Sequence, residues 1–106
     1  MIKVVCKYIP NPIRAIAIWP FVFFRTEALS EEAVLINHEK IHLEQQKETL
    51  LVPFFVIYVI QGMVNFIKGD NPYLAYRNTS AEKEAWDNED SGNYLSIRKR
   101  YKWLLK

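Results

Sequence analysis

The sequence predicts a mainly α fold of the α+β class, in which a β-rich N-terminal segment, residues 1–29, precedes a helical part, residues 30–106. The first segment is rich in β-branched and aromatic residues and is interrupted by prolines. The second contains repeated signals for the start and the end of helices. Because the chain has 106 residues, half of them hydrophobic, we expect a single domain, residues 1–106, with one modest core.

The N-terminal segment is expected to contain short extended pieces. Residues 2–8 alternate in part between apolar and polar side chains, which predicts a strand. Residues 13–25 are rich in Ile, Trp, Phe and Val, but Pro20 lies in their middle and favours an edge strand, or two short pieces, over a central strand. We expect these pieces to form a small sheet or hairpin against the helix that follows.

A helix over roughly residues 30–51 is predicted by Ser30, which is followed by Glu31 and Glu32. The serine hydroxyl can cap a free backbone N–H at the helix start. The two carboxylates meet the positive end of the helix dipole.

A second helix is predicted over residues 53–68. The residue before Pro53 resists helical geometry, so we expect a break or kink there, and Gly69 is a typical helix end. Residues 50–67 are eighteen in number and carry no charge, which is the lower limit for a membrane span. We interpret this stretch as the central core helix of a small domain, with peripheral membrane contact as the alternative.

The C-terminal third is expected to be helical. Pro72 predicts a short helix through Arg77, and Thr79 or Ser80 can cap another over residues 81–90. A final helix should begin near residue 94.

Five of the last nine residues are basic and are interleaved with aromatic and aliphatic side chains. Such a tail is either a solvated helix whose aromatics pack inward or a helix that lies on an anionic membrane surface. The basic residues are Arg98, Lys99, Arg100, Lys102 and Lys106.

The overall charge and the single cysteine limit the compartment and the partners. A net charge of +2 is too small to indicate nucleic acid. Cys6 alone excludes an internal disulfide and is compatible with a reducing compartment. Residues 15–24 are apolar, but Pro20 interrupts them and no small-residue cleavage site follows, so we interpret them as mature structure. We expect a cytoplasmic protein, with contact to the inner membrane or a membrane-protein partner left open, as is the oligomeric state.

An HExxH motif at residues 38–42 uses both histidines of the chain. On a helix, residues four apart have Cβ atoms roughly 5–6 Å apart, so His38 and His42 can bind one metal ion. Glu39 lies about 100° further round the turn, where its carboxylate can reach a water on the open side of the metal. The motif therefore predicts two metal ligands and a general base; the alternative is a chance spacing of two surface histidines.

A catalytic zinc ion takes three protein ligands, and the sequence has no third histidine. The third donor is then a carboxylate, unless Cys6 serves. Glu82 and Glu84 are the candidates, but they lie about 200° apart on a helix and cannot both face one metal. The alternative for Glu82 is a capping box with Thr79, in which the glutamate only satisfies a backbone N–H.

His38, Glu39 and His42, followed by the charge-free stretch and by Glu82 with Ala85 three residues later, resemble the gluzincin class of metallopeptidases. In that class the third zinc ligand is a glutamate on a later helix. The chain looks similar to the membrane peptidases that process prenylated proteins or respond to heat shock, and to the antirepressor proteases. It resembles most of all short bacterial HExxH proteins of unassigned function.

The resemblance covers roughly residues 30–90. It implies a zincin-like minimal helical domain with an N-terminal β-hairpin or short strands. It also implies hydrolysis of a peptide or protein substrate with one zinc ion held by His38, His42 and Glu82. Trp86 replaces an aspartate that is common in the family, which leaves open what orients the ligands.

Three further residues are candidates for the site. Gln45 follows His42 by three positions, so it either bonds a ligand or substrate or lies on the surface. Tyr76 and Arg77 precede the glutamate helix and are expected to stabilise the oxyanion, although Arg77 fits a surface ion pair equally well. The predicted function is zinc-dependent peptide hydrolysis; the alternative is a catalytically inactive metal-binding or membrane-associated interaction module.

Overall fold

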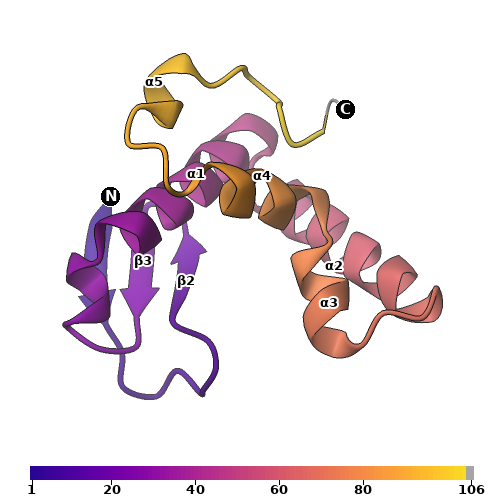
Figure 1. The fold of residues 1–106 in the computed structure, drawn as a ribbon, viewed down its shortest axis with the longest axis horizontal. Helices are drawn as coiled ribbons and strands as arrows, with labels where there is room; N and C mark the ends of the chain where they lie inside the picture. The colour runs from indigo at the N-terminus through magenta and orange to yellow at the C-terminus, as the bar shows by residue number, and fades with distance from the viewer. Residues whose placement is uncertain (105–106) are drawn as a thin grey trace.

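The computed structural model describes residues 1–104. A small sheet lies at one end of the molecule, and the helices lead away from it along a bent path (Figure 1). This arrangement confirms the prediction of a mainly α (α+β) fold with N-terminal strands. The elements in chain order are β1 (Ile2–Val5), β2 (Ala15–Ile18), β3 (Phe21–Phe24), the 3-10 turn η1 (Leu29–Glu31), α1 (Ala33–Thr49), α2 (Leu51–Ile67), α3 (Pro72–Arg77), α4 (Ser80–Asn88) and α5 (Tyr94–Ile97).

The sheet has the order β1-β3-β2, with β3 parallel to β1 and antiparallel to β2. The expectation that residues 13–25 avoid a central position is wrong for β3, because Pro20 falls in the turn between β2 and β3 and interrupts no ladder. Val22 and Phe24 of β3 are fully buried and pack in one cluster with Leu35 and Leu43 of α1. The predicted packing of the sheet on this helix is therefore confirmed.

Helix α1 begins three residues later than Ser30. The Ser30 hydroxyl is buried and donates to the carbonyl of Glu27 at 2.6 Å, so it belongs to the preceding 3-10 turn. Glu32 is the N-cap of α1 and makes no side-chain cap bond. Ser30 therefore stabilises the 3-10 turn and not the start of α1, because a serine hydroxyl can also bond backbone three residues away.

Helices α1 and α2 meet at a bend of 112°. The break falls at Leu50, where φ is 66°, and not at the residue before Pro53. Pro53 lies in the first turn of α2, where a missing N–H leaves no helical hydrogen bond unmade. Because of this bend, α1 and α2 run in different directions. Helix α4 packs against α1 (Figure 1).

Helix α2 ends as the sequence predicts. Gly69 has a φ of 118°, and its N–H bonds the carbonyl of Phe66 at 3.1 Å. The N–H of Asp70 bonds the carbonyl of Asn65, also at 3.1 Å. These paired bonds around a left-handed glycine form the Schellman motif that closes many helices.

The expectation that this helix is a buried core element is wrong. Phe54 is the one residue of α2 that is buried, and most of its other apolar side chains are exposed. Among residues 1–104, no single helix has both the length and the apolarity needed to cross a bilayer; taken together, the bent pair α1 and α2 meets those two criteria.

The C-terminal part contains the three helices that the sequence predicts, α3, α4 and α5, although α5 is short. Thr79 is the N-cap of α4, and Asn71 caps α3 through its side chain. Helix α5 ends at Ile97, and the following residues pass over α1 and α4 as turns (Figure 1). The expected final helix therefore begins at Tyr94 as predicted, but it ends before the basic tail, so neither helical interpretation of that tail holds for residues 98–104. Trp103 is buried against Phe54, with ring centroids 5.3 Å apart. Leu105 and Lys106 of the basic tail lie outside the described residues.

Candidate metal centre

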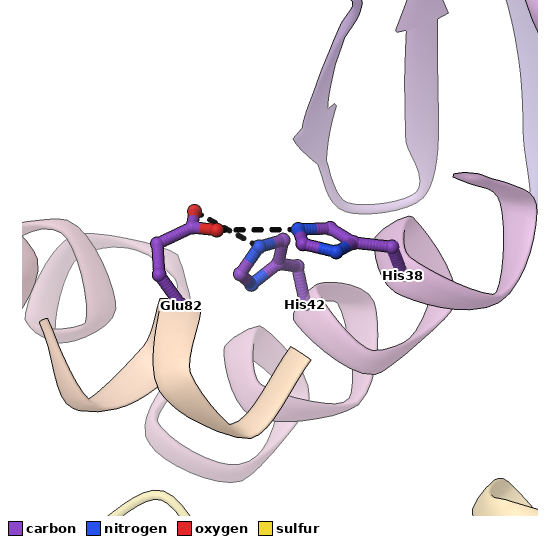
Figure 2. A group of neighbouring side chains, drawn as sticks. All are labelled: His38, His42 and Glu82. Carbon is purple, nitrogen blue, oxygen red and sulfur yellow. Dashed lines mark hydrogen bonds and ion pairs between the residues drawn. The ribbon is translucent and has the colours of Figure 1, made fainter. Parts of the chain in front are cut away.

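Two helices bring His38, His42 and Glu82 together. The imidazoles project from consecutive turns of α1 toward the carboxylate on α4 (Figure 2). One nitrogen or oxygen from each of the three residues lies within 4.8 Å of the others. All three side chains are nearly inaccessible to solvent, with residue exposures of 4–5%. The alternative of two surface histidines is therefore wrong.

The position of Glu82 follows from how α4 begins. Thr79 Oγ1 accepts from the backbone N–H of Glu82 at 3.4 Å, so the helix is capped without the glutamate side chain. The carboxylate instead faces the histidines, with Oε1 3.2 Å from His38 Nε2 and Oε2 3.0 Å from His42 Nε2. Its side chain does not serve the capping box, and Glu84 and Cys6 are not in the group that faces the histidines.

Each histidine is oriented by a hydrogen bond at Nδ1, the ring nitrogen that does not face Glu82. His38 Nδ1 lies 2.7 Å from a carboxylate oxygen of Glu89, and His42 Nδ1 lies 2.8 Å from Oε1 of Gln45. The Gln45 amide nitrogen donates to Ala81 O at 3.0 Å and to Glu84 at 2.9 Å, which fixes its oxygen as the acceptor. Both Nδ1 atoms therefore carry hydrogen, and in a neutral ring the Nε2 lone pair points at Glu82.

Two lone pairs directed at a carboxylate repel it unless a cation lies between them. His42 Nε2 is buried and lacks a hydrogen-bond partner within residues 1–104, because its orientation toward Glu82 is not that of a hydrogen bond. Two imidazole nitrogens and a carboxylate oxygen are the donor types that zinc takes in catalytic sites. The residues present therefore fit a metal ion.

In the metal-free chain a proton takes the place of that cation. Burial alone would lower the pKa of His42, but the adjacent Glu82 carboxylate outweighs it and raises this pKa to about 9. Burial would raise the pKa of Glu82, but His42 and His38 hold it well below its usual range. Glu82 is thus ionised and His42 is an imidazolium near neutral pH, so metal and proton compete for one position.

Glu39 lies on the same helix and is 5% exposed. Desolvation raises the pKa of its carboxyl, and charge on His42 and His38 opposes this only in part. Among residues 1–104 no side chain or backbone group makes a hydrogen bond to this carboxylate. A buried carboxyl with a raised pKa holds a proton more readily than an ordinary one, which suits a general base.

Two tyrosines border Glu82. The Tyr58 hydroxyl donates to Glu82 Oε2 at 2.6 Å, a bond between α2 and α4. Burial, followed by the charge of Glu82, raises the pKa of both Tyr58 and Tyr76, so both phenols are neutral donors. The sequence predicted a site role for Tyr76 and none for Tyr58.

Arg77 reaches the centre only through an aromatic ring. Its guanidinium carbon lies 4.3 Å from the centre of the Trp86 ring, and that ring stands edge-on to His38 with centroids 5.1 Å apart. The expected alternative, an ion pair between Arg77 and a nearby carboxylate, is not found within residues 1–104. Trp86 therefore supports His38 edge-on and is itself covered by Arg77.

A charged network supports Gln45 from the far side. The Glu84 carboxylate accepts a hydrogen bond from Gln45, and it accepts another from Nε of Arg98 at 2.5 Å. The same guanidinium bonds Glu48 at 2.7 and 2.9 Å. Burial opposes these charges, but the hydrogen bonds between them lower the pKa of Glu48 and raise that of Arg98. Gln45 is fully buried and bonds His42, so the alternative of a surface glutamine is wrong.

An apolar groove of about 480 Å³ lies between α2 and α3, next to the centre. Tyr58 and Tyr76, which border Glu82, also form part of its wall. The remaining lining residues are Val59, Gly62, Met63, Phe66, Ile67, Pro72 and Ala75.

No protein-family model, no curated protein and no solved structure matches this chain. The resemblance to gluzincins is therefore carried by the motif residues and their spacing alone. What the structure shows directly is coarser: a buried group of two histidines and a glutamate that can hold a metal ion.

Proposed function

We propose that this protein is a zinc-dependent peptidase in which His38, His42 and Glu82 hold the ion and Glu39 is the general base. The observation that carries the proposal is that both Nε2 atoms face one carboxylate while both Nδ1 atoms are fixed from behind. When bound, zinc supplies Lewis-acid polarisation of the scissile carbonyl and lowers the pKa of the attacking water.

The remaining steps belong to the side chains. Glu39 accepts a proton on its carboxylate as water attacks the carbonyl carbon, and it passes this proton to the amine nitrogen as the C–N bond breaks. The burial that raises its pKa lets Glu39 hold the proton between these two steps. Tyr58 keeps Glu82 oriented by donating to its Oε2.

Tyr76 is the better of the two proposed oxyanion stabilisers. Its phenol is neutral, since burial and Glu82 raise its pKa, and it borders both the centre and the groove. Arg77 lies over Trp86, so we assign it a positioning role through that ring. A peptide substrate would approach from the α2–α3 groove, where these tyrosines form the wall between it and Glu82.

Elemental analysis combined with hydrolysis tests this proposal. We expect one zinc ion per parent chain, none in His38→Ala or Glu82→Ala, and one in Glu39→Gln. On a mixture of unfolded proteins, only the parent should generate new amino termini. A metal that persists in both ligand variants, or a Glu39→Gln variant as active as the parent, would defeat the proposal.

The near-complete burial of the centre favours a second candidate, a metal-binding module without chemistry. His38, Glu39, His42 and Glu82 are each no more than 5% exposed, so a substrate has little access to the position of the ion. This candidate predicts bound zinc that raises the unfolding temperature, with no hydrolysis by the parent. The metal content is equal under both candidates, so the hydrolysis assay decides between them.

A further inference from the structure

Helix α2 has its polar residues on the inside. Phe54, Tyr58, Gln61 and Asn65 recur every three or four positions and face the protein; we call them the inner stripe. Its three polar members are all paired. Tyr58 donates to Glu82, Gln61 accepts from the backbone and hydroxyl of Ser80 at 2.8 and 3.0 Å, and Asn65 donates to the carbonyl of Ala75 at 3.0 Å.

The outer face of α2 is apolar throughout. Its side chains are 42–79% exposed, and no charged or hydrogen-bonding side chain interrupts them. A soluble helix normally has the opposite distribution, with its apolar stripe turned inward. The outer face consists of Val52, Val56, Val59, Ile60, Met63, Val64, Phe66 and Ile67.

The apolar surface continues beyond the helix at both ends. Near its start, Ile18 of β2 lines a shallow apolar hollow together with Val52, Val56 and Val59. Near its end, Pro72 of α3 lines the α2–α3 groove. Contiguous exposed patches of this kind mark interaction surfaces.

We propose that the outer face of α2 lies in the apolar layer of a lipid bilayer surface. Hydrocarbon requires that every polar group of an immersed helix be satisfied from within, and the inner stripe meets this condition. A protein partner would be expected to meet polar groups, about one hydrogen bond per 100–200 Å² of interface, and the outer face offers none. The occupant that matches this surface is therefore lipid.

The ends of the helix match the headgroup layer. Trp19, next to Ile18, and Tyr73, next to Pro72, are 47% and 52% exposed, and their amphipathic rings favour membrane–water interfaces. Lys68 directly follows α2, and its cation complements anionic lipid headgroups at that end of the outer face.

The length of α2 sets its orientation. Its 17 residues extend about 25 Å, less than the roughly 30 Å of the hydrocarbon core, so the helix lies in the interface. The candidate metal centre is on the opposite side of this helix, joined to it by Tyr58. The membrane contact thus places the centre close to the bilayer surface and does not depend on the proposed catalysis.

Vesicle flotation of the purified full chain tests the proposal. We expect the parent to float with phosphatidylcholine–phosphatidylglycerol vesicles, and Val59→Glu/Met63→Glu to lose at least tenfold in bound fraction. Val34→Glu is the matched control, because Val34 is 43% exposed in the first turn of α1, away from α2. Circular dichroism and the metal content of each variant report whether it is folded.

A second measurement tests membrane contact without a substitution in the outer face of α2. Quenching of tryptophan fluorescence by brominated lipid should be strong in the parent and mostly absent in Trp19→Phe, because Trp103 is buried and Trp86 is half-buried. Weaker flotation with phosphatidylcholine alone would support the contribution of Lys68. Absence of both flotation and quenching by the parent would overturn the proposal. So would a dimer in solution that Val59→Glu/Met63→Glu dissociates, since that face would then join two copies of the chain.

Discussion

The α1–α4 interface and the outer face of α2 are opposites in polarity. Between α1 and α4 the chain buries carboxylates, imidazoles and amides, whereas on α2 it exposes a continuous aliphatic surface. Most of the buried groups are stabilised there by hydrogen bonds or ion pairs with one another, and the carboxyl group of Glu39 is an exception. The exposed groups have no such partner. The two regions therefore motivate the two proposals made above, a bound cation inside and an apolar phase outside.

The largest effect should come from breaking the inner network at Arg98. Replacement by methionine keeps the side-chain volume but leaves Glu48 and Glu84 as buried charges without a counter-ion. We expect a loss of about 3–5 kcal/mol in the free energy of unfolding, measured with urea. The exposed Arg100→Met is the control. A loss no greater than that of the control would mean that this network does not stabilise the inner region.

Removing the support behind His38 should have the next largest effect. Glu89→Ala deletes the acceptor for His38 Nδ1, and such changes cost 10–100-fold in metal affinity. Competition with a chelator of known affinity measures it. Glu89→Gln should keep most of the affinity, because its amide oxygen can accept the same bond. If Glu89→Ala bound zinc as tightly as Asp90→Ala, the orienting role of Glu89 would be wrong.

Acid should weaken the attachment of the C-terminal segment. The pKa of Glu48 is lower in the folded chain than its ordinary value of 4.5, mainly because hydrogen bonds from Arg98 outweigh burial. Its contribution to stability is therefore full above that ordinary value and is lost as pH falls through the folded pKa. The urea midpoint should drop over this range in the parent, and the drop should be smaller in Glu48→Gln. If the urea midpoint fell equally with pH in the parent and in Glu48→Gln, Glu48 would not be the group responsible.

The smallest effect should be an increase in stability from a substitution in α2. Gly62 lies inside the helix, and a Cβ there meets no atom within 4 Å. Gly62→Ala should therefore stabilise the chain by about 1 kcal/mol, the difference in helix propensity. Ala85→Gly, in the fully buried part of α4, is the opposite change and should destabilise. Thermal unfolding compares them, and a destabilised Gly62→Ala would show that this surface tolerates no added atom.

Local signals predicted most of the helices. The bounds of α3 were predicted in full because Asn71 and Pro72 act within one turn, and Gly69 marked the end of α2 for the same reason. Ser30 misled because the same hydroxyl serves a 3-10 turn as readily as a helix. The burial of α2 was not predictable, since an apolar helix has one composition whether its surroundings are core or lipid.

Helix periodicity predicted only the part of the site that lies on one helix. The spacing of His38 and His42 places both rings on one face, and Glu82 was found through family resemblance. The residues behind them were missed, because Tyr58, Glu89 and Arg98 meet the site only through tertiary contacts. Arg98 in particular looked like one of several solvated cations in a basic tail.

The hydroxyl of Tyr58 is one atom common to two surfaces of this molecule, since it is borne by α2 and bonds the carboxylate on α4. Anything that holds α2 in this position also holds Glu82 in place for a cation. If both proposals hold, thermodynamic linkage makes the influence reciprocal: any factor by which an attached bilayer tightened zinc binding would equal the factor by which zinc tightened attachment.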